Sequence, residues 1–376
     1  MTSLSIWEKE SYYASQDVVI IGAGLMGLWT AFELKKNRPS LNITILERST
    51  TPLGASTRNA GFACFGSPTE LLNDARQMGE AEMCNIAELR YKGIKKIRQH
   101  FANSTIGFDE CSGYECIQNH AENLDEDIAW LNSLLAPITG NSADFKRVDH
   151  KLAALGLKGF DALVENSSEA GLHSGYLVKA LTQKVQALGV TILYGCAVTS
   201  WNKQANFTDV LCGDKKIKAT ALIFCTNAFT NELMNDVTIE PARGQVIVTS
   251  PIHNLALKGT FHFDEGFYYW RNLGNRILLG GARNKAIAEE CTNNLATSPI
   301  IQDALEAFLH THIAGQYNYS IDYRWSGVMG FSSNKQPIIQ CIADGVFVAM
   351  ACNGMGVALT PMIAEDVAAL VLEKFN

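Results

Sequence analysis

The sequence lacks the cysteine patterns of a metal centre or of a disulfide-rich domain. Its ten cysteines include no CxxC pair and no repeated spacing, and such spacing is the usual sign of a structural zinc site. Cys111 and Cys116 could face each other across a hairpin, but in a reducing compartment we expect both to be free thiols. Four others lie in apolar or glycine-rich surroundings, where a thiol packs as a small hydrophobic group: Cys64, Cys196, Cys225 and Cys352. We therefore expect neither a metal site nor a disulfide.

The chain also lacks an excess of positive charge. It has 31 Lys and Arg against 38 Asp and Glu, a net charge of −7, whereas nucleic-acid binding needs a basic surface. We therefore expect no nucleic-acid partner. The first residues are polar and contain no apolar core of a secretory signal, so we expect a cytoplasmic location.

Long hydrophobic segments are equally rare. Residues 345–364 carry no charge over about the 20 residues that cross a bilayer. Asn353, three glycines and Pro361 divide this stretch into a strand, a turn and the start of a helix, so we expect no transmembrane segment. No internal repeat or low-complexity segment is visible, and 376 residues suit two domains.

What the sequence does contain is a βαβ pattern over residues 17–47. An apolar strand (17–21) runs into a glycine-rich turn, a helix-period segment follows, and a second strand (43–46) ends on Glu47. The turn has the GxGxxG spacing, in which the first glycine permits the tight turn, the second lets the backbone approach a pyrophosphate, and the third lets helix and strand pack closely: Gly22, Gly24 and Gly27. Glu47 then lies where a carboxylate can bind the ribose hydroxyls. This unit predicts a dinucleotide site.

Two further segments favour FAD over NAD as the dinucleotide. Arg48 follows Glu47, and the loop 54–61 (GASTRNAG) offers backbone N–H groups, two hydroxyls and a guanidinium to a pyrophosphate. The turn 353–356 (NGMG) lies between an apolar strand and a helix. The positive end of that helix can stabilise negative charge on a reduced flavin, for which a nicotinamide enzyme has no obvious need.

The rest of the sequence predicts alternating helices and strands, interrupted by a strand-rich segment from about 240 to 322. Residues 107–118 alternate like a hairpin that turns at Ser112 and Gly113. The expected helices are 69–101, 122–136, 176–187, 300–312 and 358–373. The expected strands are 189–195, which we expect to be buried, 219–226, 245–249, 266–271, 276–281 and 346–351.

Nine motifs in order give the chain a family resemblance. It resembles the D-amino-acid-oxidase-type (DAO) FAD-dependent oxidoreductases, which include glycine oxidase and sarcosine oxidase, and it is more similar to their γ-glutamylputrescine oxidase branch. The motifs are GAGLMG with Glu47-Arg48, GASTRNAG, GLHSGYLVKAL (171–181), GVTILYGCAVTSW (189–201), IFCTNAF (223–229), PARGQV (241–246), GFYYWR with ILLGGAR (266–283), WSGVMGFSSNKQPII (325–339) and NGMGV (353–357).

This resemblance implies an α/β fold with α+β insertions. A Rossmann-like FAD-binding domain (1–80, 150–235 and 335–376) would carry a discontinuous substrate domain (81–149 and 236–334) on a mixed, largely antiparallel sheet. The cofactor-binding residues that we expect are Gly22, Gly24, Leu25, Met26, Gly27, Glu47, Arg48, Ser56, Thr57, Arg58, Asn59, Val198, Thr226, Asn353, Gly354, Met355, Gly356 and Val357. FAD is expected to be non-covalent, because the segment 325–333 has no cysteine and the loop 54–61 has no histidine.

The chemistry that the resemblance implies is oxidation of a carbon–nitrogen bond. Hydride passes from the α-carbon of an amine or amino acid to flavin N5, and the resulting imine hydrolyses; O₂ or a quinone or other carrier then takes the electrons. The flavin drives this reaction, so we assign no catalytic side chain and no metal. His173 and His262 lie nearest the motifs, and we favour a structural role for each.

The substrate-pocket candidates that the resemblance implies are Tyr268, Arg283, Trp325 and Met329. Members similar to glycine oxidase carry an arginine in a W-x-G-x-R motif that binds the substrate carboxylate, and here Met329 takes its place. Arg58, Arg271 or Arg283 could still supply a cation. The alternatives to an amine or amino-acid oxidoreductase are an NAD(P)-dependent dehydrogenase, a non-catalytic flavin-binding protein and a flavoenzyme acting on modified tRNA. The oligomeric state is left open.

Overall fold

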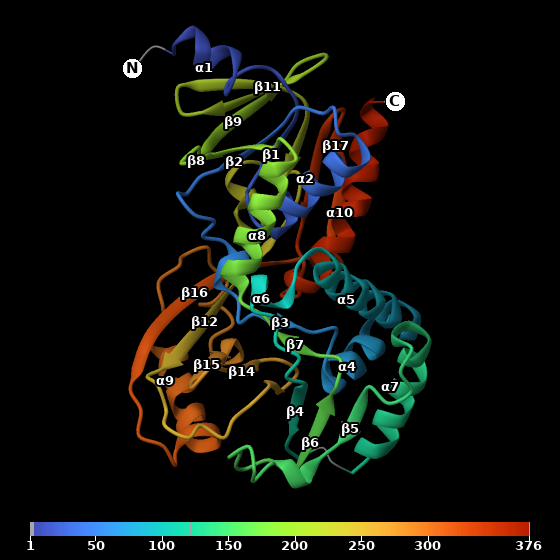
Figure 1. Cartoon of the computed structure of the whole chain (residues 1–376), viewed down its shortest axis with the longest axis vertical. Coiled ribbons are helices and arrows are strands. Elements are labelled where there is room, and N and C mark those ends of the chain that lie inside the picture. The colour runs from blue at the N-terminus through green and yellow to red at the C-terminus, as the bar shows by residue number, and fades with distance from the viewer. Residues whose placement is uncertain (1–3, 120–121, 376) are drawn as a thin grey trace. The chain divides into compact units, whose positions relative to one another are not determined.

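The chain divides into two compact units in the computed structural model, which describes residues 4–119 and 122–375 (Figure 1). The first unit comprises residues 1–57, 175–242 and 328–376, and the second comprises residues 58–174 and 243–327. These bounds differ from those that we expected. Residues 58–80 and 150–174 belong to the second unit, and residues 236–242 and 328–334 belong to the first.

The first unit contains a parallel sheet with an antiparallel extension. Strand β1 pairs in parallel with β2 and β11, β2 pairs in parallel with β8, and β11 pairs in parallel with β18. The antiparallel strand β17 completes the order β17-β18-β11-β1-β2-β8, and β9 and β10 extend from β11. The strands are β1 (Gln16–Ile21), β2 (Ile43–Glu47), β8 (Thr191–Tyr194), β9 (Val198–Lys203), β10 (Thr208–Cys212), β11 (Lys215–Phe224), β17 (Ile338–Ala343) and β18 (Val346–Met350).

Helices α2 (Leu25–Asn37) and α10 (Gly356–Leu372) lie side by side in this unit (Figure 1). Every residue of α2 from Leu25 to Lys35 is buried, because the helix packs against the sheet as well as against α10. The βαβ unit predicted over residues 17–47 is therefore confirmed as β1, α2 and β2. The unit also contains α1 (Ile6–Glu10), α8 (Ser174–Ala187) and the 3₁₀ segment η2 (Asn227–Glu232).

Two expectations for this unit were wrong. The strand predicted at 189–195 is β8, which lies at the edge of the sheet and is partly exposed rather than buried. Cys196 and Cys212 form a disulfide across the β9–β10 pair, where Cys212 is opposite Val198. The 16-residue spacing of these cysteines is not a recognisable pattern, and their proximity arises from the hairpin.

The second unit is built on a mostly antiparallel sheet with the order β16-β12-β15-β14-β13-β4-β6-β5. Only the β13–β4 pair is parallel among its described pairings. A separate two-stranded sheet pairs β3 with β7. The strands are β3 (Phe62–Ala63), β4 (Gly113–Ile117), β5 (Phe145–Arg147), β6 (Ala162–Asn166), β7 (Ala170–Gly171), β12 (Glu240–Thr249), β13 (Thr260–Phe263), β14 (Tyr268–Leu273), β15 (Arg276–Gly281) and β16 (Ile321–Phe331). Residues 240–242 of β12 and 328–331 of β16 belong to the first unit.

The predicted hairpin over 107–118 does not form. Only β4 lies in this segment, and its partners are β6 and β13, which come from later parts of the chain. Ser112 does adopt the positive φ of 63° expected of a turn, but it leads into β4 rather than between two paired strands. Cys111 and Cys116 are both free thiols, as expected.

The helices of the second unit follow the predicted periods closely. The long helical region is two helices, which separate at Gly79 because its φ of 90° cannot continue a helix. The helix predicted near 300–312 is α9, continued by one π-helical turn, Leu309–Ala314. The helices are α3 (Ala55–Arg58), which crosses the boundary between the units, α4 (Pro68–Met78), α5 (Glu80–His100), α6 (Asn103–Ile106), α7 (Leu124–Thr139) and α9 (Pro299–Phe308).

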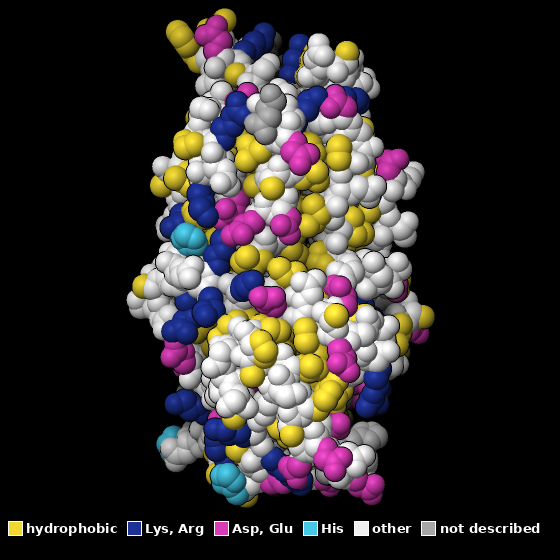
Figure 2. Space-filling model, turned by 90° about the vertical axis from the view of Figure 1, so that its right-hand side faces the viewer, with side chains coloured by type: hydrophobic (Ala, Val, Ile, Leu, Met, Phe, Trp, Pro, Cys, Tyr) yellow, Lys and Arg dark blue, Asp and Glu magenta, His cyan; other side chains and the backbone are white. Residues whose placement is uncertain are grey.

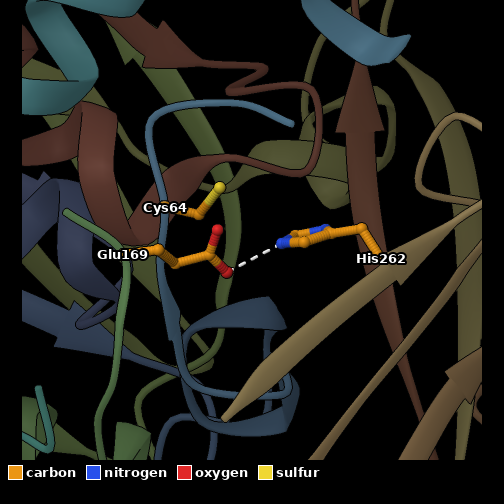
Figure 3. Close-up of side chains that lie close together, drawn as sticks. All are labelled: Cys64, Glu169 and His262. Carbon is orange, nitrogen blue, oxygen red and sulfur yellow. Dashed lines mark hydrogen bonds and ion pairs between the residues drawn. The ribbon is translucent and has the colours of Figure 1, made fainter. Parts of the chain in front are cut away.

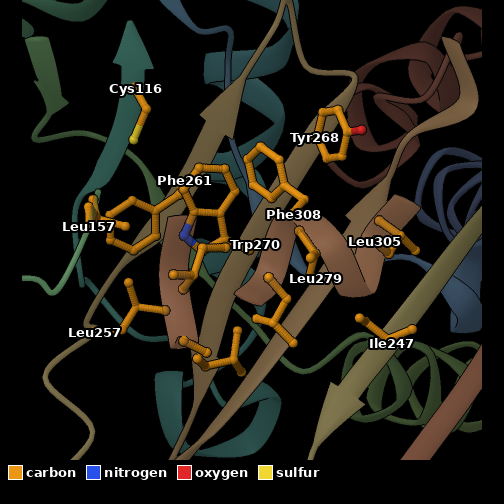
Figure 4. Close-up of a cluster of buried hydrophobic side chains, with 14 of the residues drawn as sticks. Cys116, Leu157, Ile247, Leu257, Phe261, Tyr268, Trp270, Leu279, Leu305 and Phe308 are labelled. Carbon is orange, nitrogen blue, oxygen red and sulfur yellow. The ribbon is translucent and has the colours of Figure 1, made fainter. Parts of the chain in front are cut away.

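An aromatic core fills the space between this sheet and α9 (Figure 4). Phe261 stacks on Trp270 with their ring centroids 5.4 Å apart, and Phe308 of α9 stacks on Tyr268 at 4.2 Å. Such rings bury large apolar areas and dominate the energetics of a core. The sheet and α9 are thereby held in one arrangement.

The surface carries both signs of charge. Figure 2 shows one face, on which Lys and Arg side chains are interspersed with Asp and Glu side chains. Among the described helices, none has the length and hydrophobicity needed to cross a membrane.

Candidate functional site

The turn between β1 and α2 has the tight geometry that the three glycines predict. Gly22 has a φ of 106°, and a Cβ atom at this position would lie 2.7 Å from the carbonyl oxygen of Cys225. A Cβ atom on Gly27 would lie only 2.1 Å from the carbonyl oxygen of Gly22. Side chains are therefore excluded at both positions, and the helix begins close to the end of the strand.

The N-terminus of α2 receives no hydrogen bond from a side chain of its own N-cap residue. Gly24 is the N-cap residue and supplies no side-chain cap, while the backbone N–H of Leu25 donates to Ser56 Oγ at 2.9 Å. The first N–H groups of a helix have no partner within it and carry a partial positive charge. This turn, with Met26 in the first helical turn, has the shape and polarity of a pyrophosphate site.

Glu47 ends β2 beside this turn and is buried. Its two carboxylate oxygens accept hydrogen bonds from the backbone N–H groups of Ala23 at 3.0 Å and Ser49 at 3.1 Å. These bonds fix the orientation of the carboxylate and use one acceptor position on each oxygen. A carboxylate has about four such positions, so both oxygens retain capacity for ribose hydroxyls. The glycine cradle and this carboxylate together fit the ADP half of a dinucleotide.

The segment after β2 has its own local contacts. The Arg48 guanidinium lies 3.9 Å from the ring centroid of Phe229 and forms an ion pair with Glu232. Thr57 Oγ1 donates to the carbonyl of Pro52. The structure therefore ties Arg48 to η2 rather than leaving it extended towards the turn after β1.

Arg58 and Asn59 belong to the second unit, where both have structural partners. Arg58 donates to the carbonyl oxygen of Ser326 at 2.9 Å. Asn59 Oδ1 accepts hydrogen bonds from the Gly61 N–H at 2.8 Å and from Ser174 Oγ at 2.6 Å. These bonds hold the loop, so the expected contribution of these two side chains to cofactor binding remains a prediction.

A second helix N-terminus lies at α10 in the first unit. Asn353 and Gly354 have φ values of 48° and 86°, and Met355 is an N-cap without a side-chain cap. The Asn353 side chain braces the turn, because its Oδ1 accepts from the Ser332 N–H at 3.0 Å and its Nδ2 donates to the carbonyl of Ala351 at 2.8 Å. The N–H groups of the first turn, Gly356 and Val357, are thereby presented at a rigid position.

The thiols beside this turn are not nucleophiles at neutral pH. Burial raises the pKa of Cys352 to about 12, and burial likewise raises the pKa of Cys225 far above its usual range. Val198 and Thr226 occupy the remaining predicted positions. Val198 begins β9 and packs at the edge of the core, and Thr226 Oγ1 lies 2.7 Å from Thr230 Oγ1 at the start of η2.

Met329 lies beside the α10 turn. A Cβ atom on Gly354 would be 3.6 Å from Met329 Sδ, which is ordinary van der Waals contact. The preceding residues of β16 belong to the second unit, in which Trp325 Nε1 donates to the carbonyl oxygen of Arg58 at 2.9 Å. Trp325 also packs on Val246, Val248 and Leu278, so the structure gives it a packing role.

Tyr268, which we expected to line a substrate pocket, lies on the core side of β14. Its ring lies in the aromatic core against Phe308, because successive residues of a strand point to opposite faces. Tyr269 occupies the other face, where its ring lies 6.1 Å from that of Phe62. Burial raises the pKa of Tyr269 to about 12, so it is a neutral hydroxyl at physiological pH.

Two of the three arginines that could bind a substrate carboxylate donate hydrogen bonds to backbone carbonyls. Arg58 is bonded to Ser326 as described, and Arg271 donates to the carbonyl oxygens of Gly61 at 2.6 Å and Leu172 at 3.0 Å. Arg283 is half-buried, with its guanidinium 5.8 Å from the ring centroid of Phe267.

A further group of side chains was not predicted as a site. Cys64, Glu169 and His262 come together in the second unit, with each ligand atom within 4.8 Å of the others. No sequence spacing relates these three residues. Only the strand pairings of the fold bring them together.

Comparison with known proteins gives consistent matches across the chain. The model of the family described as FAD dependent oxidoreductase (DAO) matches residues 17–370. The protein named "Probable oxidoreductase OrdL" from Haemophilus influenzae is 22% identical over 373 residues, which cover 95% of this chain and 83% of that protein.

Solved structures show the same fold. L-proline dehydrogenase from P. horikoshii superposes with a TM-score of 0.77 at 17% identity, covering 96% of this chain and 94% of that chain. Glycine oxidase from Geobacillus kaustophilus gives a TM-score of 0.73 at 19% identity, covering 96% of this chain and 95% of that chain. The predicted fold class, an α/β Rossmann-like domain with a second domain on a mixed, largely antiparallel sheet, is confirmed.

Proposed function

Because this chain belongs to the DAO family of FAD-dependent oxidoreductases, we propose that it oxidises the carbon–nitrogen bond of an amine that lacks an α-carboxylate. FAD is the cofactor of this family, so the NAD(P)-dependent alternative is set aside. The proposal concerns the substrate class and the residues that serve the reaction.

FAD would be held through its pyrophosphate, its adenosine ribose and its ring system. The three glycines and the N-terminus of α2 would bind the pyrophosphate, and Glu47 would bind the ribose. The N–H groups at the start of α10 would lie against the ring system and favour its negatively charged form. When bound, FAD supplies the oxidising equivalent by accepting hydride from the carbon next to the substrate nitrogen.

Met329 is the observation that carries the substrate class. The thioether is apolar, half-buried and in contact with the turn before α10. In the W-x-G-x-R motif of glycine-oxidase-like proteins, an arginine at this position binds the substrate carboxylate through paired, charge-assisted hydrogen bonds. A thioether cannot bind an anion in this way and would favour an uncharged substituent instead.

The other arginines do not readily replace the missing one. Arg58 and Arg271 donate to backbone carbonyls, and withdrawing either would break charge-assisted hydrogen bonds that contribute about 1.5–3 kcal/mol each. Arg283, beside the Phe267 ring, stays a candidate for binding a carboxylate. A substrate with a distant carboxylate, such as a γ-glutamylated amine, is compatible with Met329 and is included in the test.

The test is anaerobic reduction of the bound flavin by matched substrate pairs. Each pair differs only in the α-carboxylate, for example ethylamine against D-alanine and methylamine against glycine, with putrescine and γ-glutamylputrescine added. We expect faster bleaching of the flavin absorbance by the carboxylate-free member of each pair. Faster reduction by glycine or D-alanine would contradict the proposal.

A matched pair of variants isolates Met329. Met329→Arg should gain activity with D-alanine or glycine relative to the amine, whereas Met329→Leu should keep the preference of the wild type. The ratio of kcat/KM values for the two substrates is the quantity compared, because it cancels differences in FAD content. Bleaching by none of the substrates would support the non-catalytic flavin-binding alternative instead.

A further inference from the structure

Cys64 and Glu169 are brought face to face by the short β3–β7 sheet. Phe62 is paired with Gly171 and Ala63 with Ala170 in this antiparallel pair. The next opposed positions along the same register are therefore Cys64 and Glu169. Residues directly opposite in an antiparallel pair have their side chains close together.

The third side chain comes from β13. Thr260 and His262 are two residues apart on this strand, so their side chains share one face. Both bond the same carboxylate oxygen of Glu169, with Thr260 Oγ1 at 2.6 Å and His262 Nε2 at 2.7 Å. A Cβ atom on Gly113 would lie 2.3 Å from Glu169 Cδ, so the glycine leaves the space that this carboxylate occupies.

The three ligand atoms converge in a buried position. The Glu169 carboxylate and the His262 imidazole face each other, with Cys64 beside the carboxylate (Figure 3), and the three ligand atoms lie within 4.8 Å of one another. The exposed fractions are 2% for Cys64, 2% for Glu169 and 8% for His262. A chance surface cluster of polar groups would not be buried to this degree, because burying them costs free energy unless they are paired.

The surroundings are rich in carboxylates. Glu115 is the register partner of His262 on the neighbouring strand, and it is held by Ser67 and Thr69. Glu70 is close by and is paired with Arg90. Arg90 balances the charge of Glu70, and Arg271 also lies near Glu169, so Glu169 and Glu115 are the carboxylates that would attract a cation here.

We propose that Cys64, Glu169 and His262 bind one Zn²⁺ ion. A thiolate, an imidazole and a carboxylate are the ligand types that zinc prefers, and three protein ligands leave one position of a tetrahedron for water or a neighbouring oxygen. Zinc–ligand distances are about 2.0–2.3 Å, so shifts of about 1 Å would place all three atoms around one ion. Binding releases the thiol proton and the proton shared by His262 and Glu169 to solvent.

Such an ion would join segments that are far apart in the sequence. It would link the β3–β7 pair to β13, and it would replace the single hydrogen bond between Glu169 and His262 by three coordinate bonds. Because the ion binds the folded state, it should raise the melting temperature of the FAD-loaded protein. This role is independent of the proposed amine oxidation.

The experiment starts from FAD-loaded protein that has been dialysed against EDTA. ZnCl₂ is added, unbound metal is removed, and the zinc and protein contents are measured by mass spectrometry of the metal and by absorbance. CoCl₂ is used as a second probe, because a thiolate ligand gives a charge-transfer band and tetrahedral coordination gives intense bands beyond the absorption of the flavin. We expect one metal ion per chain and both spectral signatures.

Matched variants locate the site. Loss of an outer partner of a metal ligand costs 10–100-fold in affinity, so loss of a ligand should cost at least about 100-fold. We expect this loss for Cys64→Ala and for His262→Gln, and no change for Cys116→Ala, which removes another buried free thiol of the same unit. Should Cys64→Ala fail to fold, His262→Gln and the cobalt spectrum of the wild type still decide the outcome.

Two results would overturn the proposal. One is the absence of stoichiometric zinc and cobalt binding by the wild-type protein. The other is equal binding by the wild type, Cys64→Ala and His262→Gln, which would place the metal on exposed thiols such as Cys291 or Cys341. Neither result would bear on the amine preference, which is measured by flavin reduction.

Discussion

Replacing Gly27 with alanine should weaken FAD binding, because the new methyl group has no room. A Cβ atom at this position would lie 2.1 Å from the carbonyl oxygen of Gly22 and 3.2 Å from Ile20 Cγ2. The first contact is with backbone, so no side chain can rotate away. To restore a normal carbon–oxygen separation, the start of α2 must move by about 1 Å.

The expected loss of FAD affinity depends on whether the free or the FAD-bound protein resists this movement of α2. Overpacking of a well-packed site costs about 1–3 kcal/mol. The apoprotein can relieve the strain by shifting α2, but FAD needs the helix N-terminus in its original place. The strain therefore appears in the binding step, and 1–3 kcal/mol corresponds to a loss of about 5- to 150-fold in affinity.

The assay is a titration of apoprotein with FAD, in which the quenching of flavin fluorescence measures binding. Gly54→Ala is the matched control, because a Cβ atom on Gly54 would meet nothing within 4 Å. Far-UV circular dichroism confirms that each variant is folded. Equal FAD affinities of Gly27→Ala, Gly54→Ala and the wild type would refute the reasoning.

Three further predictions concern stability. Burial alone would raise the pKa of Glu290, but hydrogen bonds led by those from Arg243 lower it below the usual 4.5. The stability that this pair contributes is therefore present above pH 4.5 and is lost as the pH falls. In urea titrations at acidic pH, Glu290→Gln should consequently show a smaller decline of the unfolding free energy than the wild type. Phe308→Ala should cost about 3–5 kcal/mol in the same titrations at neutral pH, because it leaves a cavity beside four aromatic rings. Gly113→Ala should lower the melting temperature, because its methyl group would displace the Glu169 carboxylate; an unchanged melting curve would contradict this placement.

Local patterns were sufficient to predict the dinucleotide end of the molecule. The run from residue 17 to Glu47 contains a strand, a turn, a helix and a second strand in immediate succession, and most contacts of the turn are made within this unit or with Ser56 nearby. Helix periods were also readable, apart from the break that the positive φ of Gly79 imposes. Such features depend on neighbours in the sequence, which a single sequence displays directly.

The pairing of strands that are far apart in the sequence could not be predicted. The alternation at 107–118 was read as a hairpin, but the partners of β4 come from residues 162–166 and 260–263. The disulfide between Cys196 and Cys212 depends likewise on the β9–β10 pairing. A pattern of period two indicates a strand and its two faces, but it does not say which strand lies beside it.

For the same reason, the sequence alone does not show which of two adjacent tyrosines faces the core of the second unit. Alternation requires Tyr268 and Tyr269 to point to opposite sides, and only the position of α9, with Phe308 stacked on Tyr268, shows which side is the core. Tyr269 is the register partner of His262, so these two side chains share the other face. The Phe62 ring lies 5.1 Å from that of His262 and also contacts Tyr269. The polar chemistry of the second unit, including the three proposed zinc ligands, therefore gathers on the face that carries Tyr269, and substitutions that probe it should be placed there rather than at Tyr268.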